Sequence, residues 1–193
     1  MRFEDLKKHH FILASKSPRR QYLLKELGLQ FDIHTKEVDE SFPEHLKAHE
    51  IPLYLSEKKA NAFEGELADE SIVITSDTIV WVENRVLNKP VDKADAVRML
   101  QLLSGKMHEV YTGVCLKSKR KMISFYVRTN VYFKPLSLEE IDYYVTTYNP
   151  YDKAGAYGAQ EWIGYIAVEK IEGSYFNVMG LPLKELYEQL LKF

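Results

Sequence analysis

Short apolar runs predict three strands in the first half of the chain. Residues 11–14, Phe-Ile-Leu-Ala, form a continuous apolar run between polar residues, which is typical of a buried strand. A second strand is expected over residues 31–34. Residues 71–75 are rich in β-branched side chains and predict a third strand, which ends directly before Ser76-Asp77-Thr78. The pattern therefore predicts that Asp77 follows the carboxyl end of a strand and lies at an edge of the sheet.

Amphipathic segments between and after these runs predict helices. Ser17 has the side chain of an N-cap and Pro18 suits the first helical position, so a helix is expected from there to Gly28. Ser137 and Glu140 have the spacing of a capping box for a helix that ends near residue 148. Apolar residues at helical spacing predict further helices over residues 52–63, 94–103 and 183–191.

The rest of the pattern predicts additional strands and two loops. Stretches typical of strands cover residues 79–82, 85–87, 108–117, 122–133 and the region around 163–169, and those at 108–117 and 122–133 are expected to be antiparallel. The polar residues 43–50 predict a loop. Residues 152–160 are rich in small side chains and predict a second loop, whose backbone can come close to a ligand. The alternation of these elements predicts a mixed α/β fold.

Length and composition narrow the classes of protein to which the chain can belong. A chain of 193 residues, 46% hydrophobic and 28% charged, suits one folded domain, or one domain split into two lobes by a cleft. Its net charge of −2 provides no broad field for nucleic acid or an anionic membrane, so phosphate binding requires locally placed cations. The single cysteine, Cys115, excludes an internal disulfide and indicates a reducing compartment. Since no apolar stretch approaches the length of a membrane span, we expect a cytoplasmic protein.

The segment Ser15-Lys16-Ser17-Pro18-Arg19-Arg20 lies where a strand turns into a helix. The first N–H groups of a helix lack internal partners, and together with serine hydroxyls and guanidinium groups they form an anion site. A capped helix with two solvated arginines is the alternative, and the residues alone leave both open. No G-x-x-x-x-G-K-[ST], G-x-S-x-G or G-x-G-x-x-G occurs, which argues against P-loop, acyl-transfer and dinucleotide chemistry.

Several charged residues elsewhere are candidates for the same site. A carboxylate such as Asp77 binds a divalent cation or takes a proton from water, and Glu40 is a candidate for sharing a metal with it. Lys59 and Lys89 are candidates for neutralising phosphate charge, although such lysines are commonly plain surface. His45 and His49 are four residues apart, but Leu46 stands where zincin chemistry requires glutamate, so we discount a metal site there.

Seven motifs, in this order and spacing, make the chain similar to the Maf family from about residue 11 to residue 190. They are LASKSPRR at 13–20, SDTIV at 76–80, NKP at 88–90, LSGK at 103–106, YTGV at 111–114, DKAGAYGAQ at 152–160 and EGSYFNVMGLP at 172–182. The resemblance implies an elongated mixed β-sheet flanked by helices, with two lobes around a central cleft, as in the inosine triphosphate pyrophosphatases. It also implies a nucleoside triphosphate pyrophosphatase, which cleaves between the α and β phosphates.

The resemblance further implies the roles of individual residues. The catalytic aspartate corresponds to Asp77, with Ser76 in place of the usual alanine, and Glu40 is the acidic group near a divalent cation, Mg²⁺ or Mn²⁺. The residues that correspond to the family's phosphate-binding groups are Ser15, Arg19, Arg20, Lys59 and Lys89. Lys59 is chosen over Lys58 because the family lysine is followed directly by alanine.

Within the family, the chain is similar to the branch that hydrolyses dTTP and UTP. That branch combines the residues corresponding to Arg20, Thr78 and Gln160, which favours a pyrimidine nucleotide. Glu161 and Trp162 stand where the usual loop of this family has small residues, so we expect the base pocket to differ from that of the family. The alternatives are a 7-methyl-GTP pyrophosphatase, a nucleotide-binding regulator of septum formation and a phosphatase that releases orthophosphate. A homodimer is expected by resemblance, and neither nucleic acid nor membrane is expected as a partner.

Overall fold

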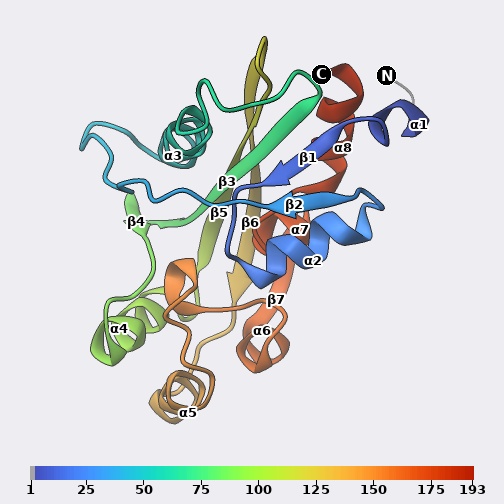
Figure 1. The fold of residues 1–193 in the computed structure, drawn as a ribbon. Coiled ribbons are helices and arrows are strands. Elements are labelled where there is room, and N and C mark those ends of the chain that lie inside the picture. Colours follow the sequence, from blue (N-terminus) through green and yellow to red (C-terminus); the bar gives the residue numbers. More distant parts are fainter. Residues whose placement is uncertain (1–2) are drawn as a thin grey trace.

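The computed structural model describes residues 3–193 and places seven strands in one mixed sheet (Figure 1). The strands are β1 (His10–Leu13), β2 (Phe31–Ile33), β3 (Ser71–Val82), β4 (Arg85–Leu87), β5 (Met107–Lys117), β6 (Met122–Phe133) and β7 (Val168–Glu172). Their order across the sheet is β2-β1-β3-β5-β6-β7, and β4 pairs with β3. β1 is parallel to β2 and β3, whereas the other pairs are antiparallel. The predicted mixed α/β fold is confirmed.

Helices pack on both faces of the sheet. They are α1 (Phe3–Leu6), α2 (Pro18–Glu26), α3 (Glu50–Asn61), α4 (Lys93–Leu103), α5 (Leu138–Tyr148), α6 (Trp162–Ala167), α7 (Tyr175–Val178) and α8 (Leu183–Lys192), with the 3-10 helix η1 (Ala154–Ala156). Figure 1 shows α3 on one side of the long strands and α2 with α8 on the other. Among the residues described, no helix is long and apolar enough to cross a membrane.

Local sequence signals account for several helix ends. Ser17 accepts a hydrogen bond from the backbone N–H of Arg20 at the start of α2, with Pro18 in the first turn. Ser137 and Glu140 form the predicted capping box of α5. Both predictions are confirmed, because these bonds join residues that are only three positions apart.

The sequence prediction was wrong about where β3 ends. Instead of stopping at residue 75, β3 is one strand of twelve residues, so Asp77 lies in its middle. Its pairing with β5 is unbroken from Val73 to Trp81, which holds the backbone extended. On the other edge of β3, the pairing with β1 extends only to Ile74, and the pairing with β4 begins only at Val80. Among the described residues, no strand therefore covers that edge at 75–79, and Asp77 lies in this gap.

A second prediction was wrong around residues 163–169. Residues Trp162–Ala167 form the helix α6, and the strand β7 begins only at Val168. Ile163 and Ala167 are fully buried, and their spacing of four residues is that of one helix face. Short apolar runs fit a strand and a helix equally well, and here packing against the α4 and α5 side of the core decides for a helix.

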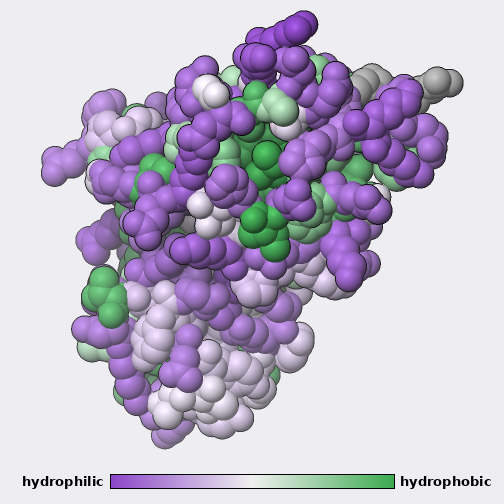
Figure 2. Space-filling view, viewed as in Figure 1, coloured by the Kyte–Doolittle hydropathy of each residue, from purple (hydrophilic) through white to green (hydrophobic). Residues whose placement is uncertain are grey.

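Two large apolar clusters form at opposite ends of the long strands. One combines α2 and α8 with β1 and the first half of β3, and the other combines α4, α5 and α6 with the second half of β3. Ile72 and Ile74 face the first cluster, whereas Val73 faces the opposite side of the sheet. Hydrophilic side chains cover most of the face drawn in Figure 2, where hydrophobic residues form only small areas. The middle of β3, between the two clusters, is polar.

Candidate active site

A pocket of about 640 Å³ lies over the open edge of β3. It is formed by the loop before α2, residues 35–40, the C-terminal turn of α3, the middle of β3, and the loops around residues 89, 152–160 and 178–180. Every residue predicted for the site lines it: Ser15, Arg19, Arg20, Glu40, Lys59, Asp77, Thr78, Lys89 and Gln160. The structure thus brings the whole predicted set together, while the role of each residue stays a prediction.

Strand alternation decides which way Asp77 points. Thr75 and Ile79, two residues before and after it, contact α3: the Thr75 hydroxyl donates to the Ser56 carbonyl at 2.7 Å, and Ile79 packs with α3 residues. Asp77 faces the same side and meets Lys59, whose Nζ lies 2.6 Å from its Oδ1. The side chain of Asp77 is only 13% exposed, so this ion pair is largely screened from solvent.

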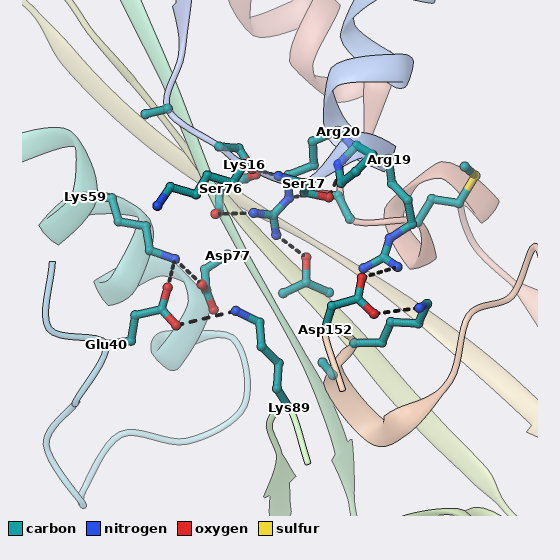
Figure 3. Close-up of a pocket in the computed structure, with 18 of the residues that line it drawn as sticks. Lys16, Ser17, Arg19, Arg20, Glu40, Lys59, Ser76, Asp77, Lys89 and Asp152 are labelled. Carbon is teal, nitrogen blue, oxygen red and sulfur yellow. Dashed lines mark hydrogen bonds and ion pairs between the residues drawn. The ribbon is translucent and has the colours of Figure 1, made fainter. Parts of the chain in front are cut away.

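Glu40 contacts the same ammonium group from a loop far away in sequence. Its Oε1 lies 2.8 Å from Lys59 Nζ, and its Oε2 lies 3.6 Å from Lys89 Nζ (Figure 3). Burial acts to raise the pKa of Glu40, but the two lysines outweigh it and lower that pKa below its ordinary value. Lys58, by contrast, pairs with Asp39 outside the pocket. Lys59 is therefore the lysine that faces Asp77, as the neighbouring alanine indicated.

The start of α2 places polar groups on the opposite wall of the pocket. Ser15 is 7% exposed, and its hydroxyl accepts the backbone N–H of Ser17 at 3.2 Å. Arg19 reaches across the pocket, where its Nη1 lies 3.3 Å from Asp152 Oδ2 (Figure 3). Because this is the one contact of its guanidinium among residues 3–193, Arg19 has donors left for an anion.

Arg20 is held much more firmly than Arg19. Its Nε donates to the Gly180 carbonyl at 2.9 Å, one Nη to the Ser76 carbonyl at 2.8 Å, and the other to the Thr78 hydroxyl at 3.0 Å. The Ser76 carbonyl is one that the uncovered edge of β3 leaves without a strand partner. Burial lowers the pKa of the Arg20 guanidinium, and Asp77 opposes that shift. Two of its five N–H donors remain for a ligand.

A buried line of hydroxyls fixes the orientation of Thr78. The hydroxyl oxygens of Thr78 and Thr112 are 2.9 Å apart, and Thr112 donates to the Asn177 carbonyl at 3.0 Å. Thr112 has one hydroxyl proton, so Thr78 is the donor between the two, which leaves its oxygen to accept from Arg20. Thr112 lay in a motif quoted from the sequence but received no role there, because only the fold shows what it contacts.

The loop at 152–160 contributes both a neutral amide and charged groups. Gln160 lines the pocket, as predicted for a residue that selects the base. Asp152 contacts Arg19 with one oxygen, and its other oxygen lies 2.6 Å from Lys153 Nζ. Burial acts to raise the pKa of Asp152, but Lys153 and Arg19 outweigh burial and lower that pKa below its ordinary value. The sequence alone predicts no role for Asp152 or Lys153.

Other candidates lie outside this arrangement. Glu161 and Trp162, the changes expected to alter the base pocket, do not line it. His49 stacks on Tyr126 with ring centroids 4.2 Å apart. Among residues 3–193, no group of three or more histidine, cysteine, aspartate or glutamate side chains is arranged to hold a metal.

Comparison with known proteins places this geometry in a family. The family model described as Maf-like protein matches residues 10–193. The chain belongs to the Maf family. A Flavobacterium johnsoniae protein named dTTP/UTP pyrophosphatase is 54% identical over 97% of this chain and 96% of its own length. A protein of the same name from Parabacteroides distasonis is 49% identical over 98% of this chain and 99% of its own length.

The solved structures support the fold of this Maf protein. The structure of the Staphylococcus aureus Ham1 protein superposes with a TM-score of 0.51 at 15% sequence identity, covering 93% of this chain and 99% of that one. At this low identity the similarity concerns the fold alone. The fold expected from the resemblance is thereby confirmed.

Proposed function

We propose that this Maf protein hydrolyses dTTP and UTP to the nucleoside monophosphate and pyrophosphate. The observation that carries the proposal is a single pocket in which four cations from three separate segments surround one largely buried carboxylate, Asp77. These cations are Arg19, Arg20, Lys59 and Lys89. The names of relatives that are about half identical over nearly the whole chain support the same reaction.

The arrangement supports a division of labour among the pocket residues. Hydrolysis requires water to attack a phosphorus atom surrounded by negative oxygens, so the site must compensate charge and deprotonate water. Lys59, Lys89 and Arg19 hold the triphosphate, and Asp77 takes the proton from the attacking water. Arg20, with most donors already used by the protein, presents its remaining N–H groups in a fixed direction and contributes to the choice of substrate.

The two carboxylates fit a hard divalent cation. Oxygens of Asp77 and Glu40 converge on one position, which the ammonium group of Lys59 takes in this structure. Mg²⁺ is commonly held by one or two carboxylates together with water and substrate phosphates, which matches this donor set. When bound, such an ion screens the phosphate charge and polarises the scissile linkage. We propose Asp77 and Glu40 as its protein ligands.

A product assay with a panel of nucleotides tests the proposal. The purified protein is incubated with UTP, dTTP, GTP and 7-methyl-GTP, with Mg²⁺ or with a chelator, and pyrophosphate and orthophosphate are measured separately. We expect pyrophosphate from the pyrimidine nucleotides, only in the presence of metal. Orthophosphate as the product, preference for 7-methyl-GTP, or tight binding without turnover would each contradict the proposal in favour of a named alternative.

Replacing Asp77 tests the assignment of the general base. Asp77→Asn keeps the shape of the side chain, so the fold should be retained while turnover falls at least ~100-fold, as is typical of the loss of a general base. Asp69→Asn is the control, because Asp69 pairs with Lys119 on the exposed surface. Near-normal turnover by a folded Asp77→Asn protein would rule the assignment out.

Replacing Gln160 tests base recognition. Gln160→Ala should change the preference for UTP over GTP while the dependence on metal stays the same, because Gln160 lines the pocket but is not one of the two carboxylates proposed as metal ligands. Equal losses on every nucleotide would contradict a role in recognition. The cytoplasmic location and the homodimer expected from the sequence stay predictions, which fractionation and light scattering test.

A further inference from the structure

Glu161 directly follows Gln160 in the chain, but unlike Gln160 it does not line the pocket. Its carboxylate accepts from two side chains: Lys153 Nζ, 3.0 Å from Oε1, and the hydroxyl of Tyr144, which donates to Oε2. The Tyr144 oxygen in turn accepts the backbone N–H of Gly158 at 3.0 Å. One carboxylate thus connects the start, the middle and the end of the loop at 153–161.

The burial of this network makes the negative charge of Glu161 necessary. Lys153 is 7% exposed and Tyr144 is fully buried. A buried ammonium group needs counter-charges, and Lys153 has two, Asp152 and Glu161. Asp152 is shared with Arg19, whereas Lys153 is the one cation that contacts Glu161 among the described residues.

The backbone of the loop is fitted to this carboxylate. A Cβ atom at Gly158 would lie 2.8 Å from the Glu161 carboxyl carbon, which is too close for any other residue without displacement. Glu161 also directly follows Gln160, and its own N–H donates to the Gly158 carbonyl at 3.0 Å. The position of the Gln160 side chain in the pocket therefore depends on where the Glu161 carboxylate is held.

We propose that Glu161 is a positioning residue for nucleotide selection: by binding Lys153 and Tyr144 it clamps the loop that carries Gln160. The inference rests on the proposed function, since it concerns the choice between nucleotides in that pocket. Glu161 then supports the loop that carries Gln160 and does not contact the base.

The first test measures the clamp without any nucleotide. Hydrogen exchange of peptides that cover residues 153–160 is compared between the wild type and Glu161→Gln, which removes the charge and keeps the size. We expect exchange about tenfold faster in the variant, which corresponds to about 1.4 kcal/mol of lost protection. Glu172→Gln is a matched control, because Glu172 also accepts from a lysine and a tyrosine, Lys170 and Tyr132, but on the exposed surface.

The second test measures selectivity. Glu161→Gln should raise KM about tenfold for UTP with a smaller change in kcat, and should reduce the preference for UTP over GTP. In a Lys153→Met background the buried ammonium group is absent. The same substitution should then change both the KM for UTP and the preference for UTP over GTP much less. A general electrostatic effect on triphosphates would change the KM for every nucleotide by the same factor, and that result would overturn the proposal.

The two tests separate failure of this inference from failure of the proposed function. If the wild type releases no pyrophosphate, the proposed function is wrong, and the exchange rates still decide whether Glu161 clamps the loop. If the wild type is active but Glu161→Gln exchanges and discriminates like the wild type, Glu161 has no positioning role. If Glu161→Gln has a lower thermal stability but unchanged KM and selectivity, Glu161 has only a structural role, and the proposal is overturned.

Discussion

His108 should make the protein sensitive to mild acid. Its side chain is 1% exposed and lies edge-on to the rings of Phe133 and Tyr157, with Nε2 2.8 Å from the Tyr157 hydroxyl. Burial lowers the pKa of His108 to about 3, because the charged imidazolium cannot be solvated there. Tyr157 belongs to the loop at 152–160, so the histidine supports a wall of the active site.

The pKa of His108 determines the size of the effect and its sign. In the unfolded chain a histidine titrates near ~6.5, so below that pH the unfolded state binds a proton that the folded state refuses. The contribution to stability is therefore complete above about pH 6.5 and is lost as the pH falls toward about 3. At pH 5, roughly 1.5 pH units below the unfolded pKa, the loss is about 2 kcal/mol at ~1.36 kcal/mol per unit.

Urea unfolding at pH 7 and pH 5 tests this reasoning. Between these values the wild type should lose about 2 kcal/mol more free energy of unfolding than His108→Gln, which keeps a polar partner for Tyr157 but does not titrate. His45→Gln, at an exposed position, should keep the wild-type pH dependence. If His108→Gln loses as much stability as the wild type, the buried neutral histidine does not account for acid sensitivity.

Three further substitutions test the supporting structure of the pocket. Thr112→Val should lower the free energy of unfolding by about 1–3 kcal/mol, since it leaves buried partners unsatisfied. It should also raise the KM for UTP, because Arg20 loses its orientation. Urea unfolding and steady-state kinetics measure the two effects, and wild-type values would contradict the role of the hydroxyl line through Thr78 and Thr112. Lys59→Met should tighten Mn²⁺ binding in the absence of nucleotide, measured by calorimetry, while turnover falls; unchanged affinity would mean that the ammonium does not compete with the metal. Gly113→Ala should cost about 1–3 kcal/mol by thermal unfolding, because its Cβ would lie 2.4 Å from the Pro52 backbone, and a stable variant would contradict this close approach of α3 to β5.

Local order was predictable from the sequence. The caps at Ser17 and Ser137 depend on bonds between residues three positions apart, so their pattern is visible in the chain itself. The resemblance to the Maf family also selected every predicted site residue that the pocket brings together, including Lys59 in preference to its neighbour Lys58. Where a run fitted two structures, as at Trp162–Ala167, the sequence alone did not decide between helix and strand.

The position and the contacts of each side chain in the site were decided by the tertiary structure. Asp77 lies in mid-strand because β5 pairs along β3 on one edge while β1 and β4 leave the other edge open. Arg20 is fixed by three hydrogen bonds, whereas one contact holds Arg19 among the described residues. All of these partners lie more than 50 positions away in the sequence, so only the folded chain shows the difference. Glu161 is directed away from the pocket by Lys153 and Tyr144. The residue types determine which chemistry is available, but orientation and charge compensation arise from contacts between segments that only folding brings together.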